Sequence, residues 1–181
     1  HAGDFTGQGK MQEIENFNTW FSLLPHKYKL VIAGNHDRGF EEEPKKAQEL
    51  LTNCHYLQDR SITIEGIKFY GSPWQPEFFN WAFNLPRGKP LKDKWAQIPN
   101  DTDVLITHGP PIGIRDFVDN KENVGCVDLW KRVNLIQPKL HIFGHIHENH
   151  GITKIGRTTF INASICDNRN RVINKPIVVE V

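Results

Sequence analysis

The sequence has little of several features that would place it in a common functional class. Its three cysteines form no Cys-x-x-Cys pair, which favours reduced thiols in a cytosolic protein over a disulfide framework. The net charge of +1 gives no reason to expect a nucleic acid or an anionic membrane as partner. No apolar stretch approaches the roughly 20 residues of a bilayer-spanning helix. We therefore predict a cytoplasmic location, with neither nucleic acid nor membrane as partner.

Several signatures of catalysis are also missing. The chain has no Gly-x-Ser-x-Gly elbow and no P-loop, and it contains no internal repeat or low-complexity segment. Its 181 residues are enough for one core, so we expect a single domain over residues 1–181.

Apolar periodicity alternates between helix and strand along the chain. We expect helices over residues 11–24, 41–51 and 125–136, the last with Val127, Trp130 and Val133 on one face. Buried strands are expected over residues 28–33, 104–106, 140–143 and 177–181, and two-residue turns at 65–66 and 156–157 predict hairpins over 62–70 and 152–161. This alternation predicts layered sheets flanked by helices.

Four polar clusters come directly after predicted strands. They are Gly3-Asp4, Gly34-Asn35-His36-Asp37, Thr107-His108-Gly109 and Gly144-His145-Ile146-His147. Sites in open α/β proteins collect in the loops beyond the strand ends, and Asp, Asn and His are side chains that bind divalent metals. A lone His-x-His would be weak evidence, since alternate residues of a strand share a face. Four clusters in this order predict one metal centre built from distant segments.

The ordered motifs resemble those of the calcineurin-like metallophosphoesterase superfamily, over essentially the whole chain. The chain is most similar to the metallophosphoesterase-domain-containing branch, which is related to class III cyclic nucleotide phosphodiesterases, on residues 1–6, 107–111, 138–144 and 161–164. The resemblance implies a four-layer α/β sandwich, with two central sheets flanked by helices. It also implies metal-dependent hydrolysis of a phosphoester, with a cyclic nucleotide or another small phosphodiester as the substrate.

The resemblance also implies how the metal ligands are shared. Asp4 would bridge two metal ions, and His147 would bind the first of them. The ligands of the second ion would be completed by Asn35, His108 and His145. These mixed nitrogen and oxygen ligands suit Mn²⁺, Fe or Zn²⁺ and do not choose among them.

Catalysis and substrate binding would fall to the Gly-Asn-His-Asp motif. By the same resemblance, His36 would face the scissile phosphate and protonate or stabilise the leaving oxygen, and Asp37 would orient His36 and tune its charge. Arg38 would approach the phosphate, and Asn35 would contact the substrate beside His36.

The chain departs from the superfamily at its start. Members begin with an Asp-x-His motif on the first strand, which supplies two ligands of the first metal, whereas this sequence opens with His1-Ala2-Gly3-Asp4. Those residues read as the end of a strand, so we expect a fragment of a longer product, with the first strand missing. The full-length protein would then hold two divalent ions.

Two other functions remain open. The chain could be a nucleotide-binding regulatory protein with an incomplete metal centre and low activity, which a comparison of kcat with nucleotide affinity would separate from a hydrolase. It could instead be a phosphoprotein phosphatase of the same superfamily, although it is short for a protein-binding groove. A phosphopeptide assayed beside a cyclic nucleotide distinguishes these two substrates.

Metal analysis tests the expectation of an incomplete centre. After loading with excess Mn²⁺ and gel filtration, the 181-residue chain should retain one ion at most, because only Asp4 and His147 remain to bind the first metal. Two tightly bound ions per chain would contradict this expectation.

Overall fold

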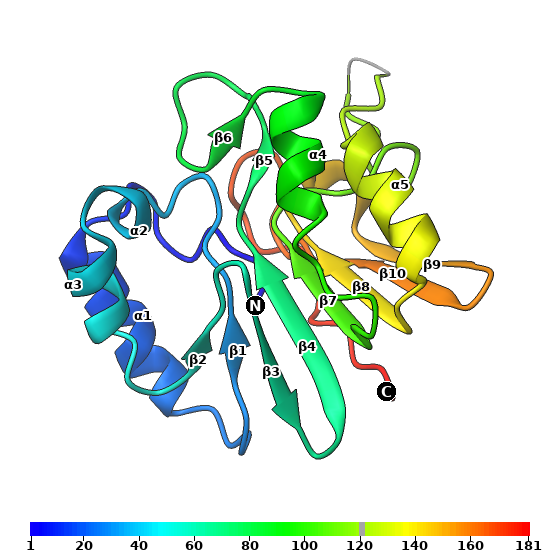
Figure 1. The fold of residues 1–181 in the computed structure, drawn as a ribbon. Helices are drawn as coiled ribbons and strands as arrows, with labels where there is room; N and C mark the ends of the chain where they lie inside the picture. Colours follow the sequence, from blue (N-terminus) through cyan, green and yellow to red (C-terminus); the bar gives the residue numbers. More distant parts are fainter. Residues whose placement is uncertain (120–121) are drawn as a thin grey trace.

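The computed structural model describes residues 1–119 and 122–181, and its centre is a six-stranded sheet (Figure 1). The strand order is β3-β4-β7-β8-β10-β9. The strands are β3 (Arg60–Ile64), β4 (Ile67–Ser72), β7 (Val104–Thr107), β8 (Leu140–Phe143), β9 (Gly151–Ile155) and β10 (Thr158–Asn162). The four inner strands are parallel, and antiparallel hairpins place β3 and β9 at the two edges.

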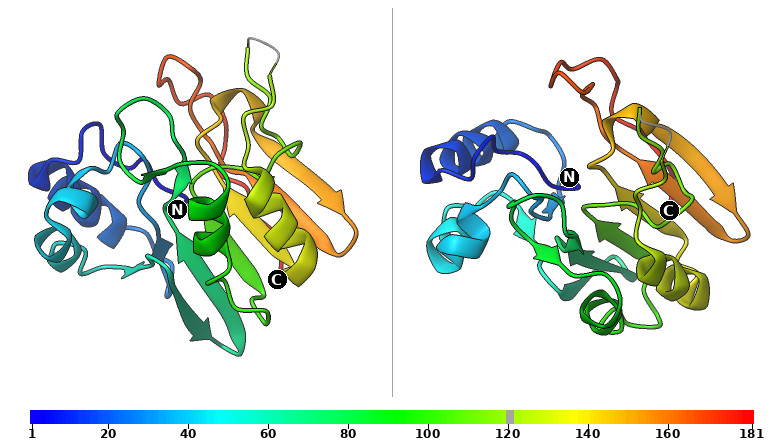
Figure 2. Two further views of the ribbon diagram at one scale, coloured as in Figure 1. Left: turned by 45° about the horizontal axis from the view of Figure 1, so that its top comes forward. Right: turned by 90° about the horizontal axis from the view of Figure 1, so that it is seen from above.

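A smaller sheet and five helices complete the layers. Strands β1 (Leu30–Val31) and β2 (His55–Tyr56) pair in parallel, with α1 (Met11–Ser22), α2 (Gly39–Glu42) and α3 (Pro44–Glu49) beside them. Helices α4 (Lys89–Trp95) and α5 (Val127–Ile136) cover the other side of the six-stranded sheet (Figure 2). A third parallel pair, β5 (Gln75–Pro76) and β6 (Asn84–Leu85), and the short 3-10 helix η1 (His147–Asn149) lie in connecting loops. Over the described ranges, no helix combines the length and apolarity needed to cross a membrane.

Three apolar cores separate these layers. The first lies between helices α1–α3 and the small sheet, the second between the two sheets, and the third between the six-stranded sheet and helices α4 and α5. Strand β7 shows the alternation, because Leu105 belongs to the third core while Val104 and Ile106 belong to the second. The four layers are therefore helices α1–α3, the small sheet, the large sheet, and helices α4 and α5, as the family resemblance predicts.

The two hairpins have the predicted turns. Ile64 pairs with Ile67, which leaves Glu65 and Gly66 as a two-residue loop, and both have positive φ angles (51° and 83°). A positive φ at both loop residues is the pattern of a type I′ turn, whose twist matches that of the flanking strands. The second hairpin turns at residues 156–157, where only the glycine has a positive φ.

The predicted strand over residues 177–181 is wrong. Ile177 and Val179 pack against the core between the sheets, while Val178 is 92% exposed, so the alternation identifies the buried side. The segment has no strand assignment. It lies against the face of the large sheet, and a new strand can join a ladder only at an edge.

Helix α5 buries only part of the predicted stripe, because Val133 is buried and Trp130 packs against the third core but Val127 does not. Val127 is 43% exposed, whereas Leu129 and Val133, four residues apart, are buried against the large sheet. The helix begins after its N-cap, Cys126, whose sulfur accepts from the backbone N–H of Leu129. Val127 therefore lies in the first turn, on the side that faces solvent.

A partly buried ion pair fixes helix α4 to the large sheet near the strand ends. The carboxylate of Asp59 accepts from Ser72 Oγ (2.7 Å), Trp74 Nε1 (2.8 Å) and Lys94 Nζ (2.8 Å). The Asp59 and Lys94 side chains are each only 18% exposed, and the Lys94 ammonium lies over the Trp74 ring. Removing the carboxylate leaves a poorly hydrated cation with no anionic partner in this network.

Replacing Asp59 tests this network. Asp59→Ala should lower the free energy of unfolding by about 2 kcal/mol, because one member of a partly buried charge pair and three hydrogen bonds are lost. Asp101→Ala is the matched control, since its pair with Lys68 involves a carboxylate that is 74% exposed, and its loss should have a much smaller effect. Urea unfolding at pH 7 measures both variants, and equal losses would contradict the proposed role of Asp59.

Candidate metal centre

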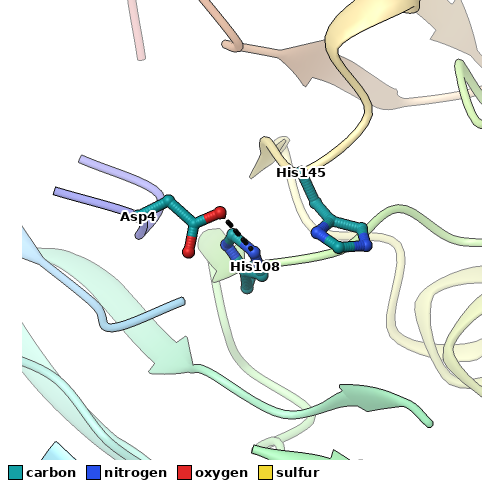
Figure 3. Close-up of side chains that lie close together, drawn as sticks. All are labelled: Asp4, His108 and His145. Carbon is teal, nitrogen blue, oxygen red and sulfur yellow. Dashed lines mark ion pairs between the residues drawn. The ribbon is translucent and has the colours of Figure 1, made fainter. Parts of the chain in front are cut away.

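The N-terminal segment and the loops that leave β7 and β8 bring three predicted ligands together. Asp4, His108 and His145 each offer a ligand atom, and these atoms lie within 4.8 Å of one another. Figure 3 shows the three side chains approaching one another from separate segments. His108 Nε2 lies 3.3 Å from Asp4 Oδ2, and the rings of His108 and His145 have centroids 4.9 Å apart.

Asn35 completes a set of oxygen atoms around His108. Its Oδ1 lies 2.8 Å from His108 Nε2, the same nitrogen that contacts Asp4, while His108 Nδ1 donates to the carbonyl of Ala2 (2.9 Å). Because the Nδ1 proton is held by a carbonyl, the lone pair of the neutral ring is on Nε2. Two oxygen acceptors and this nitrogen then meet at one point. A divalent cation at that point would be bound by all three of these atoms, so the donors fit a metal ion.

The electrostatics of the cluster also agree with a cation bound between these residues. Burial lowers the pKa of His108, but the Asp4 carboxylate, the Ala2 carbonyl and Asp37 together outweigh burial and the net shift is upward. Burial opposes the charge on Asp4, yet His108 and the backbone N–H of His36 hold the pKa of Asp4 well below its usual range. Burial, and then the neighbouring His108, lower the pKa of His145 to about 3. His145 is therefore neutral at pH 7, the form in which imidazole binds metals.

Two of the three candidate ligands have unusual backbone conformations. Asp4 has a φ of 58° and His145 a φ of 66°, although neither is a glycine. Ile146 N donates to the carbonyl of Gly144 (2.7 Å), so His145 is the central residue of a γ-turn with positive φ. Such conformations cost about 1–3 kcal/mol each and persist only where the surroundings hold them.

Asp37 holds the conformation of the Asp4 segment. Its buried carboxylate accepts from the backbone N–H groups of Asp4 (2.8 Å), Gly34 (2.7 Å) and Thr6 (3.0 Å), and from the Thr6 hydroxyl (2.7 Å). Four donors saturate both oxygens. Asp37 therefore ties the segment around residue 4 to the loop that carries Asn35.

The predicted orientation of His36 by Asp37 is wrong. His36 Nδ1 lies 2.9 Å from the carbonyl of Gly7, and no hydrogen bond in the described part of the chain joins its ring to Asp37. The ring packs on Trp81 (4.2 Å between centroids), and the His36 backbone N–H donates to Asp4 Oδ1 (2.9 Å). Both oxygens of the Asp37 carboxylate accept from Asp4, Gly34 and Thr6 instead.

His147 and Arg38 lie outside the cluster. His147 lines the same cavity, and its Nδ1 hydrogen-bonds to the carbonyl of Asp167 (2.8 Å), which leaves the lone pair on Nε2. The Arg38 guanidinium donates to the carbonyl of Asn80 and lies over the Trp81 ring. Among the described residues that line the cavity, Arg38 is absent, so its predicted contact with a phosphate has no support.

A cavity of about 700 Å³ opens beside the cluster. Its polar lining includes Asn35, His36, His145 and His147, and its apolar walls include Phe78, Trp81, Val118 and Val124. The wall formed by Val118 and Val124 had no sequence signal, because those residues belong to a loop that lacks regular periodicity. Its volume suits a small organic ligand.

The layered fold and a cluster of carboxylate, amide and imidazole ligands at the strand ends define the class of the protein as a metallophosphoesterase. The family model of the calcineurin-like phosphoesterases matches residues 1–149, and the chain belongs to this family.

Two relatives and one solved structure show how far the similarity extends. Human metallophosphoesterase domain-containing protein 1 is 46% identical over 206 aligned positions that include all of this chain, and the chain spans 63% of that relative's length. A UPF0046 protein of Caenorhabditis elegans is 42% identical, with 100% of this chain and 71% of the relative covered. The phosphopantetheinyl hydrolase of Mycobacterium tuberculosis shares the fold, with a TM-score of 0.61, 14% identity, and coverage of 93% and 79% of the two chains.

Another histidine lies beneath the site without belonging to it. His141 is fully buried on β8, and its Nε2 lies 2.8 Å from Thr107 Oγ1, which itself donates to the carbonyl of Gly109 (2.8 Å). The Thr107 proton is used, so His141 Nε2 is the donor, and Nδ1 has no partner among the described groups. Burial lowers the pKa of His141 to about 3.

Removing His145 tests the metal centre. His145→Ala should weaken Mn²⁺ binding by at least ~10-fold, since loss of even an outer hydrogen-bond partner of a ligand costs that much. Titration followed by the electron paramagnetic resonance signal of free Mn²⁺ measures the affinity. His26→Ala, at an exposed histidine, should leave the affinity unchanged. A wild-type affinity in His145→Ala would remove His145 from the ligand set.

His141 should make the stability depend on pH. Below the ordinary pKa of 6.5, His141 is protonated in the unfolded chain, whereas in the native state it stays neutral down to about pH 3. The free energy of unfolding therefore falls as pH falls through this window. Between pH 7 and pH 5 this contributes a loss of about 2 kcal/mol. His141→Phe should reduce the acid loss by that amount in urea unfolding at the two pH values. An identical loss in the two proteins would contradict the assignment.

Proposed function

We propose that this protein hydrolyses a phosphodiester with the help of a divalent metal, and that its substrate is a cyclic nucleotide or another small phosphodiester. The observation that carries the proposal is the convergence of Asp4, His108 and His145 beside a cavity of about 700 Å³. Membership in the calcineurin-like phosphoesterase family supports the reaction class.

Each candidate ligand has a defined role in binding the metal ion. Asp4, Asn35, His108 and His145 would hold the ion, and an ion bound there supplies a water of lowered pKa and neutralises charge on the phosphate. The Ala2 carbonyl keeps the Nδ1 proton of His108, so His108 would present Nε2 to the cation. The carboxylate of Asp4 is charged at neutral pH and needs no proton transfer before it binds.

We propose His36 as the group that would protonate the leaving oxygen. Its ring lines the cavity, and the Gly7 carbonyl accepts the Nδ1 proton, so Nε2 carries the transferable proton in the imidazolium form. Packing against Trp81 and the backbone bond to Asp4 Oδ1 keep the ring at a fixed position relative to the metal ligands. Position and proton donation together account for general acid catalysis by this residue.

The cavity favours a small substrate over a protein. Phe78, Trp81, Val118 and Val124 form apolar walls that can cover the organic part of a phosphodiester, and a cavity of this size encloses a ligand rather than a flat protein surface.

For the whole protein we propose two ions, manganese, iron or zinc. Asp4 and His147 would bind the first ion, and the hydrogen bond from His147 Nδ1 to the Asp167 carbonyl leaves the lone pair of His147 on Nε2. We propose that small phosphoesters or nucleotides are the natural partners of the protein.

Substitution of His36 tests the mechanism. In the full-length protein with Mn²⁺, His36→Ala should lower kcat by about 10²–10⁴-fold on bis(p-nitrophenyl) phosphate and on cyclic nucleotides, with metal content unchanged. His55→Ala, at an exposed histidine of β2, is the matched control. A normal kcat on every phosphodiester tested would show that His36 is not the acid.

The wild-type protein separates the hydrolase from the regulatory alternative. Turnover of a cyclic nucleotide and its dissociation constant are measured on one preparation. Micromolar binding without Mn²⁺-dependent turnover would favour a nucleotide-binding regulatory protein.

A further inference from the structure

The loop that carries His145 is fixed by few backbone contacts of its own. Gly144 N donates to the carbonyl of His108 (2.9 Å), and Ile146 N donates to Gly144 (2.7 Å) to close the γ-turn. The carbonyl of Ile146, between His145 and His147, points inward to a buried side chain. That side chain is Asn162, whose Nδ2 donates to it at 2.8 Å.

Asn162 is built into the end of the neighbouring strand. It is the last residue of β10, has no exposed surface, and pairs in register with Phe143 of β8. Its Oδ1 accepts from Ser164 N (3.0 Å), so the orientation of the amide is defined and Nδ2 must face the Ile146 carbonyl. The side chain is thus held by its own strand while it holds the turn that carries His145.

Asn162 also contacts the segment that fixes the residues after His147. Nδ2 lies 3.3 Å from the carbonyl of Arg115, a residue with a φ of 50°. The Arg115 guanidinium donates to the carbonyls of Asn149 (3.3 Å) and His150 (3.0 Å) and to Thr153 Oγ1 (2.9 Å). One amide group therefore joins both ends of the loop that carries the two histidines.

We propose that Asn162 is a positioning residue of the metal centre, which keeps His145 in its strained γ-turn with the imidazole directed at Asp4 and His108. The inference rests on the proposed metal site but not on the identity of the substrate. Only an amide meets all of these contacts, because Asn162 must donate to two carbonyls and accept from one N–H. A carboxylate there would set an oxygen against two carbonyl oxygens.

Cobalt binding tests the proposal without reference to turnover. Asn162→Asp should weaken Co²⁺ binding by about 10–100-fold and alter the intensity of the visible Co²⁺ absorption, because the position of an imidazole ligand changes. The control is Asn18→Asp, since the Asn18 amide also joins two segments, through Thr52 Oγ1 and Asn53 N, but lies in helix α1. Circular dichroism and urea unfolding verify that each variant is folded.

The outcomes distinguish this inference from the proposed function. Wild-type Co²⁺ affinity and spectrum in a folded Asn162→Asp variant would overturn the role of Asn162 and leave the metal site intact. A wild-type protein that binds no Co²⁺ would overturn both. Should Asn162→Asp fail to fold, Asn162→Ala, which removes the amide donor without adding charge, is measured in the same way.

A measurement on the unsubstituted protein decides the matter if neither variant folds. Because coupling between sites is reciprocal, saturating Zn²⁺ should slow hydrogen exchange of the Asn162 side-chain amide, as measured by nuclear magnetic resonance. Exchange that is unaffected by Zn²⁺ would overturn the inference.

Discussion

The contact between His108 and Asp4 is the interaction on which the site depends. It joins the first residues of the chain to the end of β7, across the space between the two sheets, and it leaves His108 Nε2 among oxygen acceptors. A proton or a metal ion at Nε2 would balance the negative charge of the oxygen atoms around this imidazole. The four-layer fold can be understood as the frame that makes this contact, because the sheets bring the ends of β1, β7 and β8 to one edge.

Strain at the site is held by buried polar side chains. Asp4 and His145 both have positive φ angles, and the backbone beside each is held by a hydrogen bond to a side chain from a distant segment. Asp37 accepts the Asp4 N–H, and Asn162 donates to the carbonyl that follows His145. Preorganised ligands of this kind avoid the entropic cost of ordering the loops when the metal binds.

The sequence predicted the layers and the ligand cluster because both follow from short-range patterns. The apolar run of β7 and the hairpin turn at residues 65–66 encode their structures locally, and the motif order brought Asp4, His108 and His145 into one hypothesis. What could not be predicted depends on three-dimensional direction. Whether the Asp37 carboxylate faces His36 or the Asp4 backbone is set by the fold of the loop, and residues 177–181 alternate correctly but meet a sheet face instead of an edge.

Crystals of the protein soaked with Mn²⁺ and measured at an anomalous wavelength test the central claim most directly. The account predicts one strong anomalous peak within about 2.0–2.3 Å of an Asp4 carboxylate oxygen, His108 Nε2 and a ring nitrogen of His145, with Asn35 Oδ1 close to the same ion. A peak elsewhere, or none at this cluster at saturating Mn²⁺, would contradict it.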